Sequence, residues 1–211
     1  MTDPAFWDRI WGSTEPSRLA EYASRFDMSE DPMIRYLKER GAVTVCDAGC
    51  GCGLYALKLA RHGFAVCGFD ISEAAVWLAK QLLSENGFPV REFRRRIVLD
   101  SGCEDGQFDA VICRSVIDHL PLRDGAAAVR ELLRIVRPGG SLLLTLDGRD
   151  AEYDSEPHTV DEDGDFLYKS GKWSGMVFHP YTPEEIGSLT AGYEVSLSGT
   201  PETGYTVMIE L

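Results

Sequence analysis

The sequence predicts a doubly wound α/β fold in a single domain, and three observations indicate it. Short apolar runs typical of strands alternate with segments whose apolar residues have helical spacing. The first apolar run ends in a glycine-rich loop that leads directly into a helical pattern. The chain of 211 residues is long enough to bury one core without disulfides or a structural metal.

Residues 1–41 predict two or three helices that precede the first strand and form an N-terminal helical cap. In the segment "PAFWDRIW", Phe6 with Ile10 and Trp7 with Trp11 are apolar pairs at helical spacing. A later helix of this cap has Pro32 in its first turn and ends at Gly41.

The central part of the chain predicts the sheet and its first covering helices. Strands are expected over 42–49, 64–70, 108–115 and 141–147, each a short apolar run. Helices are expected over 54–63 and 73–86, the second capped by Ser72. A third helix is expected from residue 125 onward, and the turn at 138–140, Pro-Gly-Gly, closes it.

Residues 148–180 break this pattern, because they are polar, acidic and aromatic with weak periodicity, and they are interpreted as a long insertion. A loop of this length in a compact domain is usually functional or disordered. A short helix over 182–189 follows, with Thr182 as its cap and Pro183 in its first position. Two closing strands are expected over 193–199 and 204–211.

Composition and net charge argue against several kinds of binding partner. The formal net charge of -13 argues against nucleic acid, since phosphates would be repelled by most of the surface. No apolar run reaches the roughly 20 residues that cross a bilayer, and the N-terminus lacks the pattern of a secretion signal, so a cytoplasmic location without membrane contact is expected. Of the six cysteines, only Cys50 and Cys52 form a close pair, so neither a metal site nor a disulfide is expected. The oligomeric state is left open.

The glycine loop points to a particular ligand. Its order is Gly49-x-Gly51-x-Gly53, which lets backbone N–H groups approach a ligand but departs from the dinucleotide pattern G-x-G-x-x-G. Asp47, at the end of the first strand, would repel a pyrophosphate and suits an ammonium group. Asp70, at the end of the second strand, is placed to accept hydrogen bonds from ribose hydroxyls. Together they favour a nucleoside with a cationic tail, as in S-adenosylmethionine.

The runs "VCDAGCGCG", "FDIS", "FDAVICRSVIDHL" and "LLRIVRPGGSLLLT" resemble the class I S-adenosylmethionine-dependent methyltransferases over roughly residues 30–147. The resemblance implies a Rossmann-like, mostly parallel seven-stranded sheet whose last strand is antiparallel. It also implies methyl transfer from S-adenosylmethionine to a small-molecule acceptor by in-line displacement. Two alternatives stay open: an NAD-dependent oxidoreductase, against which Asp47 and the missing fingerprint argue, and a non-catalytic S-adenosylmethionine-binding or interaction protein.

The resemblance also implies a role for each matched position. Asp47 would hold the methionine amino group through water, and Asp70 would bind the ribose with Ile71 against the adenine. The backbone of the glycine loop would pass under the methionine and ribose, and residues after the fourth strand would line the methyl-donor site. The loop residues concerned are Gly49, Cys50, Gly51 and Gly53, and the residues after the fourth strand are Arg114 and Ser115. Family members usually carry an acid near the adenine where this chain has Ile97, so either Asp100 or the backbone around Val98 would make that contact.

The acceptor side is expected to consist of residues 148–180 and the N-terminal helices, acting as pocket and lid. Its lid and substrate candidates are Trp7, Trp11, Tyr22, Trp173 and His179, and its candidates for a catalytic base are His179, His119 and Tyr181. For His119 the alternative is simple packing, and for Trp7, Trp11 and Tyr22 it is a place in the core. The acidic insertion favours a cationic or polar acceptor over an anionic one, although it could instead be a surface flap over a satellite core.

Overall fold

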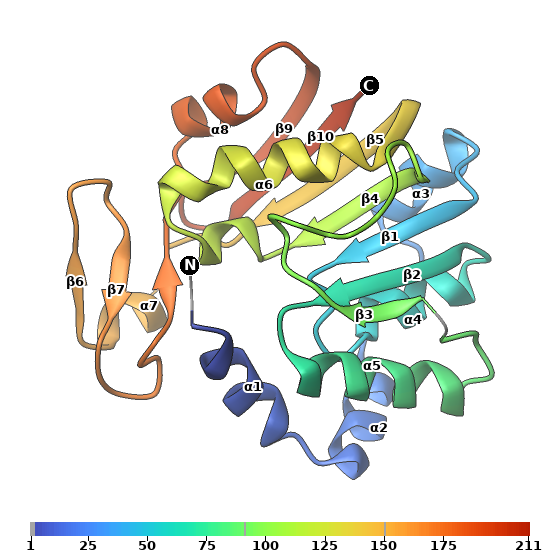
Figure 1. Ribbon diagram of the computed structural model, residues 1–211, viewed down its shortest axis with the longest axis horizontal. Helices are drawn as coiled ribbons and strands as arrows, with labels where there is room; N and C mark the ends of the chain where they lie inside the picture. Colours follow the sequence, from blue (N-terminus) through green and yellow to red (C-terminus); the bar gives the residue numbers. More distant parts are fainter. Residues whose placement is uncertain (1–2, 91, 150) are drawn as a thin grey trace.

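The computed structural model describes residues 3–90, 92–149 and 151–211. Met1, Thr2 and Asp150, which belong to the expected cap and insertion, lie outside the described residues. The main feature is a seven-stranded sheet of order β3-β2-β1-β4-β5-β10-β9 (Figure 1). Its strands are β1 (Thr44–Ala48), β2 (Ala65–Asp70), β3 (Phe93–Arg95), β4 (Phe108–Arg114), β5 (Val136–Leu146), β9 (Glu194–Thr200) and β10 (Gly204–Glu210).

The strand directions confirm the expected topology. The strand β1 pairs in parallel with both β2 and β4, and the outer pairs β2–β3 and β4–β5 are also parallel. The last strand, β10, runs antiparallel to both β5 and β9. The order reverses direction at β1, so the carboxyl ends of β1 and β4 lie side by side at the point where open α/β sheets bind ligands.

Helices cover both faces of the sheet, as Figure 1 shows with α6 in front and α3 and α4 behind. The helices are α1 (Pro4–Gly12), α2 (Pro16–Arg25), α3 (Pro32–Glu39), α4 (Leu54–Arg61), α5 (Glu73–Glu85), the 3₁₀ turn η1 (Ile117–His119), α6 (Leu122–Arg134), α7 (Ala151–Ser155) and α8 (Pro183–Leu189). The expected helices of the N-terminal cap are therefore α1, α2 and α3. No helix in the described ranges is both long and apolar enough to cross a membrane.

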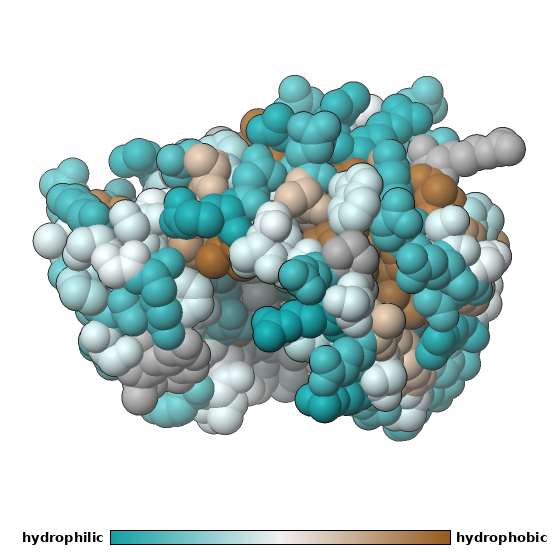
Figure 2. Space-filling view, turned by 90° about the horizontal axis from the view of Figure 1, so that it is seen from below, coloured by the Kyte–Doolittle hydropathy of each residue, from teal (hydrophilic) through white to brown (hydrophobic). Residues whose placement is uncertain are grey.

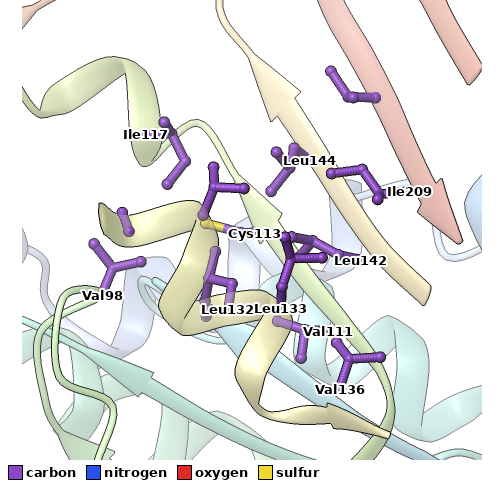
Figure 3. Close-up of a cluster of buried hydrophobic side chains, with 14 of the residues drawn as sticks. Val98, Val111, Cys113, Ile117, Leu132, Leu133, Val136, Leu142, Leu144 and Ile209 are labelled. Carbon is purple, nitrogen blue, oxygen red and sulfur yellow. The ribbon is translucent and has the colours of Figure 1, made fainter. Parts of the chain in front are cut away.

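Successive side chains along each buried strand point to opposite faces of the sheet, so the hydrophobic core has one part on each face. Val45 and Ile112 face α3 and α4, where they pack among Leu37 and other apolar side chains. Val111, Cys113 and their neighbours face α6, in the larger cluster of Figure 3. The central strands β1 and β4 are thus buried on both faces, which fixes their ends firmly in space.

The cysteines belong to this packing. All six are free, and Cys46, Cys50, Cys52 and Cys113 are buried. Burial raises the pKa of the Cys50 and Cys113 thiols well above its ordinary value, so both remain protonated at neutral pH. Neither thiol has the environment of a reactive cysteine.

The insertion is more structured than the sequence indicates. It contains α7 and a three-stranded antiparallel sheet formed by β6 (His158–Val160), β7 (Phe166–Tyr168) and β8 (Val177–Phe178). Strands of two or three residues are too short to show a period of two, so the pattern reads as a loop. The aromatic residues of this small sheet pack with Phe6 of α1 in a satellite core. In Figure 1 the small sheet lies beyond the carboxyl ends of the central strands.

Two boundaries differ from the expected ones for physical reasons. The helix α6 begins at Leu122 rather than at residue 125, because the Asp165 carboxylate accepts a hydrogen bond of 3.0 Å from the Leu122 N–H. That cap comes from 43 residues away in the chain. The Pro138–Gly140 turn does not separate helix from strand, since β5 already begins at Val136 and contains it as an irregularity opposite β4.

Candidate functional site

A cavity of about 540 Å³ opens at the carboxyl ends of β1, β2, β4 and β5. The space-filling view, seen from below, shows the molecule hollowed near its middle (Figure 2). Thirteen of the residues singled out from the sequence line this cavity: Trp7, Trp11, Asp47, Gly49, Cys50, Gly51, Asp70, Ile71, Val98, Arg114, Ser115, His119 and Trp173. Five do not: Tyr22, Gly53, Asp100, His179 and Tyr181.

The glycine loop joins β1 to α4 and forms the floor of the cavity. The N–H groups of Gly49 and Cys50 donate to the Phe69 carbonyl at 2.8 and 3.0 Å, which fixes the loop against β2. Gly49 has φ +76°, and a Cβ atom there would collide with the Val116 side chain. Glycine is needed at position 53 for a different reason. Its added Cβ atom would lie 2.8 Å from Ala79 Cα, so Gly53 permits close packing of the loop on α5.

Asp47 and Arg114 place opposite charges on one wall. The Asp47 side chain is buried, and its Oδ2 has no hydrogen-bond partner within the described part of the chain. Burial raises its pKa to about 7, although the Arg114 guanidinium opposes this rise, and the nearby Asp70 adds to it. The guanidinium of Arg114 itself stacks over the Tyr55 ring at 4.2 Å. A carboxylate and a guanidinium so arranged complement the ammonium and carboxylate of an amino acid.

Asp70 is anchored through both of its carboxylate oxygens. Its Oδ2 accepts from the Gly51 N–H and its Oδ1 from the Ser72 N–H, both at 2.9 Å. Burial raises its pKa, and these two backbone hydrogen bonds oppose the rise. The carboxylate is therefore held in one orientation at the end of β2, beside Ile71, with lone pairs left for a diol.

The next wall is formed by the segment 96–99, after β3. Ile97, Val98 and Leu99 all line the cavity, whereas Asp100 is exposed. A tight turn closed by the Asp100 N–H on the Ile97 carbonyl, at 3.0 Å, carries Asp100 away from the opening. Of the two alternatives for the missing family acid, Val98 therefore lies at the cavity and Asp100 does not.

A polar cluster stands at the far end of the cavity, after β4 and β5. Oxygen atoms of Asp118 and Asp147 and a ring nitrogen of His119 lie within 4.8 Å of one another. Ser115 donates to Asp147 Oδ1 at 2.6 Å and Tyr153 to Oδ2 at 3.0 Å. The Asp147 N–H donates to Asp118 Oδ2 at 2.9 Å. These bonds hold both carboxylates in fixed positions.

Asp118 is the buried member of this cluster, with 0% of its side chain exposed. Its Oδ1 lacks a hydrogen-bond partner in the described ranges. Burial raises its pKa to about 6, His119 opposes the rise, and Asp147 reinforces it. His119 donates from Nδ1 to the Val177 carbonyl at 3.2 Å, which assigns the ring tautomer and ties η1 to the small sheet.

The sequence did not single out Asp118 or Asp147 as site residues. A usable signal was present for Asp147, which directly follows a strand as Asp70 and Asp47 end theirs. Asp118 lies in the quoted run "VIDHL", and nothing in the sequence around it indicates that its side chain is buried.

The helix α1 and the insertion form a cover over the cavity. Trp7 and Trp11 from α1 and Trp173 and Met176 from the insertion all line it. The Asp8 carboxylate accepts from the Ser72 hydroxyl at 2.6 Å, and Arg9 donates to the Ser174 carbonyl at 2.7 Å. α1 therefore connects the start of α5 to the insertion.

Three acceptor-side candidates lie elsewhere. His179 is buried, with Nδ1 at 2.9 Å from Asp165 and Nε2 at 3.4 Å from Glu185. Tyr181 is also buried and meets the His179 ring edge-on at 4.6 Å. Both residues join the insertion to α6 and α8 instead of facing the cavity, and Tyr22 is 46% exposed. The structure thus brings His119, but neither His179 nor Tyr181, to the candidate site.

Comparison with known proteins adds to this picture. Residues 45–140 match a family model described as a methyltransferase domain. Over 117 residues the chain is 34% identical to the ubiquinone biosynthesis O-methyltransferase of Pseudomonas paraeruginosa, a match that covers 53% of this chain and 49% of the relative. The corresponding protein of Escherichia fergusonii is 31% identical over 116 residues, covering 53% and 48%. The chain spans about half the length of these curated relatives.

Solved structures extend the match to most of the chain. An S-adenosylmethionine-dependent methyltransferase of Methanosarcina mazei superposes with a TM-score of 0.70 at 22% identity, covering 86% of this chain and 98% of its own. A magnesium protoporphyrin IX methyltransferase of Synechocystis, crystallised with bound S-adenosylmethionine, gives 0.61 at 20% identity, covering 98% and 89%. At these identities the likeness establishes the fold.

Proposed function

We propose that the chain, of which residues 45–140 match a methyltransferase domain, is a class I S-adenosylmethionine-dependent methyltransferase that transfers the methyl group of S-adenosylmethionine to a small-molecule acceptor. One observation carries the proposal. The buried Asp47, whose Oδ2 lacks a partner in the described residues, shares a cavity wall with Arg114 and lies one strand away from the anchored Asp70.

The residues present fit this cofactor. Asp47 would receive the ammonium and Arg114 the carboxylate of its methionine part, which satisfies the orphaned Asp47 oxygen. Asp70 would accept from the ribose hydroxyls, and the segment 96–99 would hold the adenine. The glycine loop lets these groups approach the backbone closely.

When bound, the cofactor supplies a methyl group that is already activated on a sulfonium. The chain therefore has to hold the acceptor in line with that group, which contributes most of the rate in such reactions. Trp7, Trp11 and Trp173 cover the cavity and exclude water from it. Acceptors that must lose a proton also need a base, and the polar cluster at the far end of the cavity stands where one would act.

Two rival functions remain to be separated from this one. An NAD-dependent oxidoreductase would place a pyrophosphate beside Asp47, where like charges repel. A non-catalytic binding protein would hold the cofactor without turnover. The curated relatives are named O-methyltransferases, which makes transfer to oxygen a candidate for this chain too.

Calorimetry and turnover test the proposal. We expect S-adenosylmethionine and S-adenosylhomocysteine both to bind, and NADH not to bind, because Asp47 complements an ammonium and repels a pyrophosphate. Binding of NADH alone would show that the cofactor assignment is wrong. Binding of S-adenosylmethionine without product from a broad acceptor panel would favour the non-catalytic alternative.

Hydrogen exchange tests the proposed lid. With S-adenosylhomocysteine bound, we expect slower exchange in residues 5–25 and 165–181 as well as in the glycine loop, because α1 and the insertion both line the cavity. The hairpin of β9 and β10, at the far edge of the sheet, is the internal control. Protection confined to the glycine loop would mean that α1 and the insertion are a static cover.

A further inference from the structure

The cavity has more negative charge than the cofactor needs. In the proposed function Asp47 faces the ammonium, Arg114 the carboxylate and Asp70 the ribose. Asp147 then remains on the cavity wall, with Asp118 directly behind it. The described lining residues offer two guanidinium groups, Arg114 and Arg96, and the imidazole of His119, and Arg96 is exposed and donates to the Arg95 carbonyl. At the acceptor end, the imidazole of His119 is therefore the one basic group of the described lining residues that stands beside the two acids.

The two carboxylates retain capacity for donors. Asp147 accepts from two hydroxyls, yet each carboxylate oxygen can accept twice. Asp118 uses Oδ2 for the Asp147 N–H, while its fully buried Oδ1 has no partner among the described residues. Asp118 does not line the cavity, so its charge acts on a ligand from behind Asp147, whose remaining lone pairs can accept from the N–H donors of that ligand.

Aromatic rings surround this acidic end. The Trp7 ring meets the His119 ring edge-on at 5.1 Å, and Tyr153 lies 6.2 Å from Trp173. All four rings line the cavity, and Met176 adds an apolar contact. Ring faces attract cations, and ring surfaces also bury an apolar body. Carboxylates beside ring faces together recognise an ammonium group on an apolar carrier.

We propose that the methyl acceptor is a small organic amine, whose nitrogen binds at Asp147 beside His119, with the buried Asp118 behind it, and whose apolar body packs among Trp7, Tyr153 and Trp173. This inference rests on the proposed function and names its substrate class. The amine gives one proton to the polar cluster, which passes it to solvent. Its freed lone pair forms the N–C bond as the C–S bond breaks, and that electron pair stays on sulfur, leaving S-adenosylhomocysteine and the methylated ammonium.

Matched acceptors test the substrate class. Each pair has one apolar body and differs only in the reacting group, for example 2-phenylethylamine against 2-phenylethanol, with phenol and catechol added. Binding to the complex with S-adenosylhomocysteine is measured by calorimetry, and the methylated product is measured by mass spectrometry. We expect the amines to bind at least tenfold more tightly than the matched alcohols and to give most of the product. An amine that binds no better than its alcohol overturns the inference.

The same assay separates a rival occupant of the cluster. If catechol is methylated in preference, and if a chelator abolishes that activity while added magnesium restores it, the three residues bind a divalent cation and the amine inference is wrong. In either case S-adenosylhomocysteine still binds, so the proposed function survives. Absence of that binding is what would remove the proposed function itself.

Two variants locate the effect. Asp147→Asn is expected to weaken amine binding at least tenfold while leaving the affinity for S-adenosylhomocysteine within about twofold, because Asp147 lies on the acceptor side. Glu162→Gln removes the same charge from an exposed position of the insertion and should change neither affinity. Equal losses of amine binding in both variants would mean that the effect comes from the overall charge of the protein. Unchanged amine binding by the Asp147→Asn variant would contradict the inference directly.

Discussion

Asp47→Asn is expected to make the unliganded protein more stable at pH 8 and to weaken S-adenosylhomocysteine binding at least tenfold. Both effects come from one buried carboxylate whose Oδ2 has no partner in the described part of the chain. In the absence of a ligand, ionised Asp47 is stabilised mainly by Arg114, and burial outweighs that contribution. With the cofactor bound, the same charge would meet an ammonium.

The direction of the stability change follows from proton binding. The pKa of Asp47 is raised from an ordinary value of 3.8 to about 7 in the folded protein. Between these pH values the folded protein keeps a proton that the unfolded chain has released, so this residue's contribution to stability falls as pH rises through that interval. Each pH unit corresponds to about 1.4 kcal/mol, and the full loss above pH 7 is therefore on the order of 4 kcal/mol.

Asparagine removes this ionisation cost but buries an amide, so we expect a gain of about 1–3 kcal/mol at pH 8. At pH 4, where the carboxyl is protonated in the folded protein, the gain should vanish. Urea unfolding at both pH values measures it. Loss of the charge-assisted contact with the ammonium should cost about 1.5–3 kcal/mol of binding, or roughly tenfold to a hundredfold in affinity.

Asp100→Asn is the matched control, because it removes an exposed acid near the same sheet edge that does not line the cavity. It should leave both stability and affinity nearly unchanged. A destabilised Asp47→Asn variant would show that the Asp47 charge is well solvated or paired in solution. Weakened binding in Asp100→Asn would instead restore Asp100 as the replacement for the missing family acid.

The fold was largely predictable because its signals are local. The strands β1, β2 and β4 are apolar runs, and the strand–glycine–helix pattern around Gly49 needs only neighbouring residues. The strand β3, Phe93–Arg95, was not expected, because its three residues include two arginines and show no apolar run. The acids Asp47 and Asp70 were found by the same reasoning, since the end of a parallel strand is a position that the sequence reveals.

The acceptor side could not be predicted in the same way, because long-range contacts create it. His179 was expected at the acceptor from its place before the last helix, but Asp165 and Glu185 hold it inside a buried cluster. His119 lies at the cavity because its Nδ1 donates to Val177, 58 residues later in the chain. The small sheet makes both arrangements, and its strands are too short for a periodic signal.

The second large effect is expected for Asp70→Ala, which should lower the affinity for S-adenosylhomocysteine by tenfold or more. Each hydrogen bond from a ribose hydroxyl to this carboxylate contributes about 1.5–3 kcal/mol, since the acceptor is charged. The substitution also removes the acceptor of the Gly51 N–H, so the floor of the cavity loses its connection to the end of β2. Both losses act on binding in the same direction.

Asp70→Asn divides this effect into its two parts. Asparagine keeps one oxygen for a backbone N–H and gives up the charge, so an intermediate affinity is expected if both parts contribute. Glu73→Ala, three residues away and exposed, removes the same charge without touching the cavity and should bind as the wild type does. Thermal unfolding of the unliganded variants shows whether each one is folded. A folded Asp70→Ala variant with undiminished affinity would mean that Asp70 only shapes the loop, and that the ribose is bound by other groups.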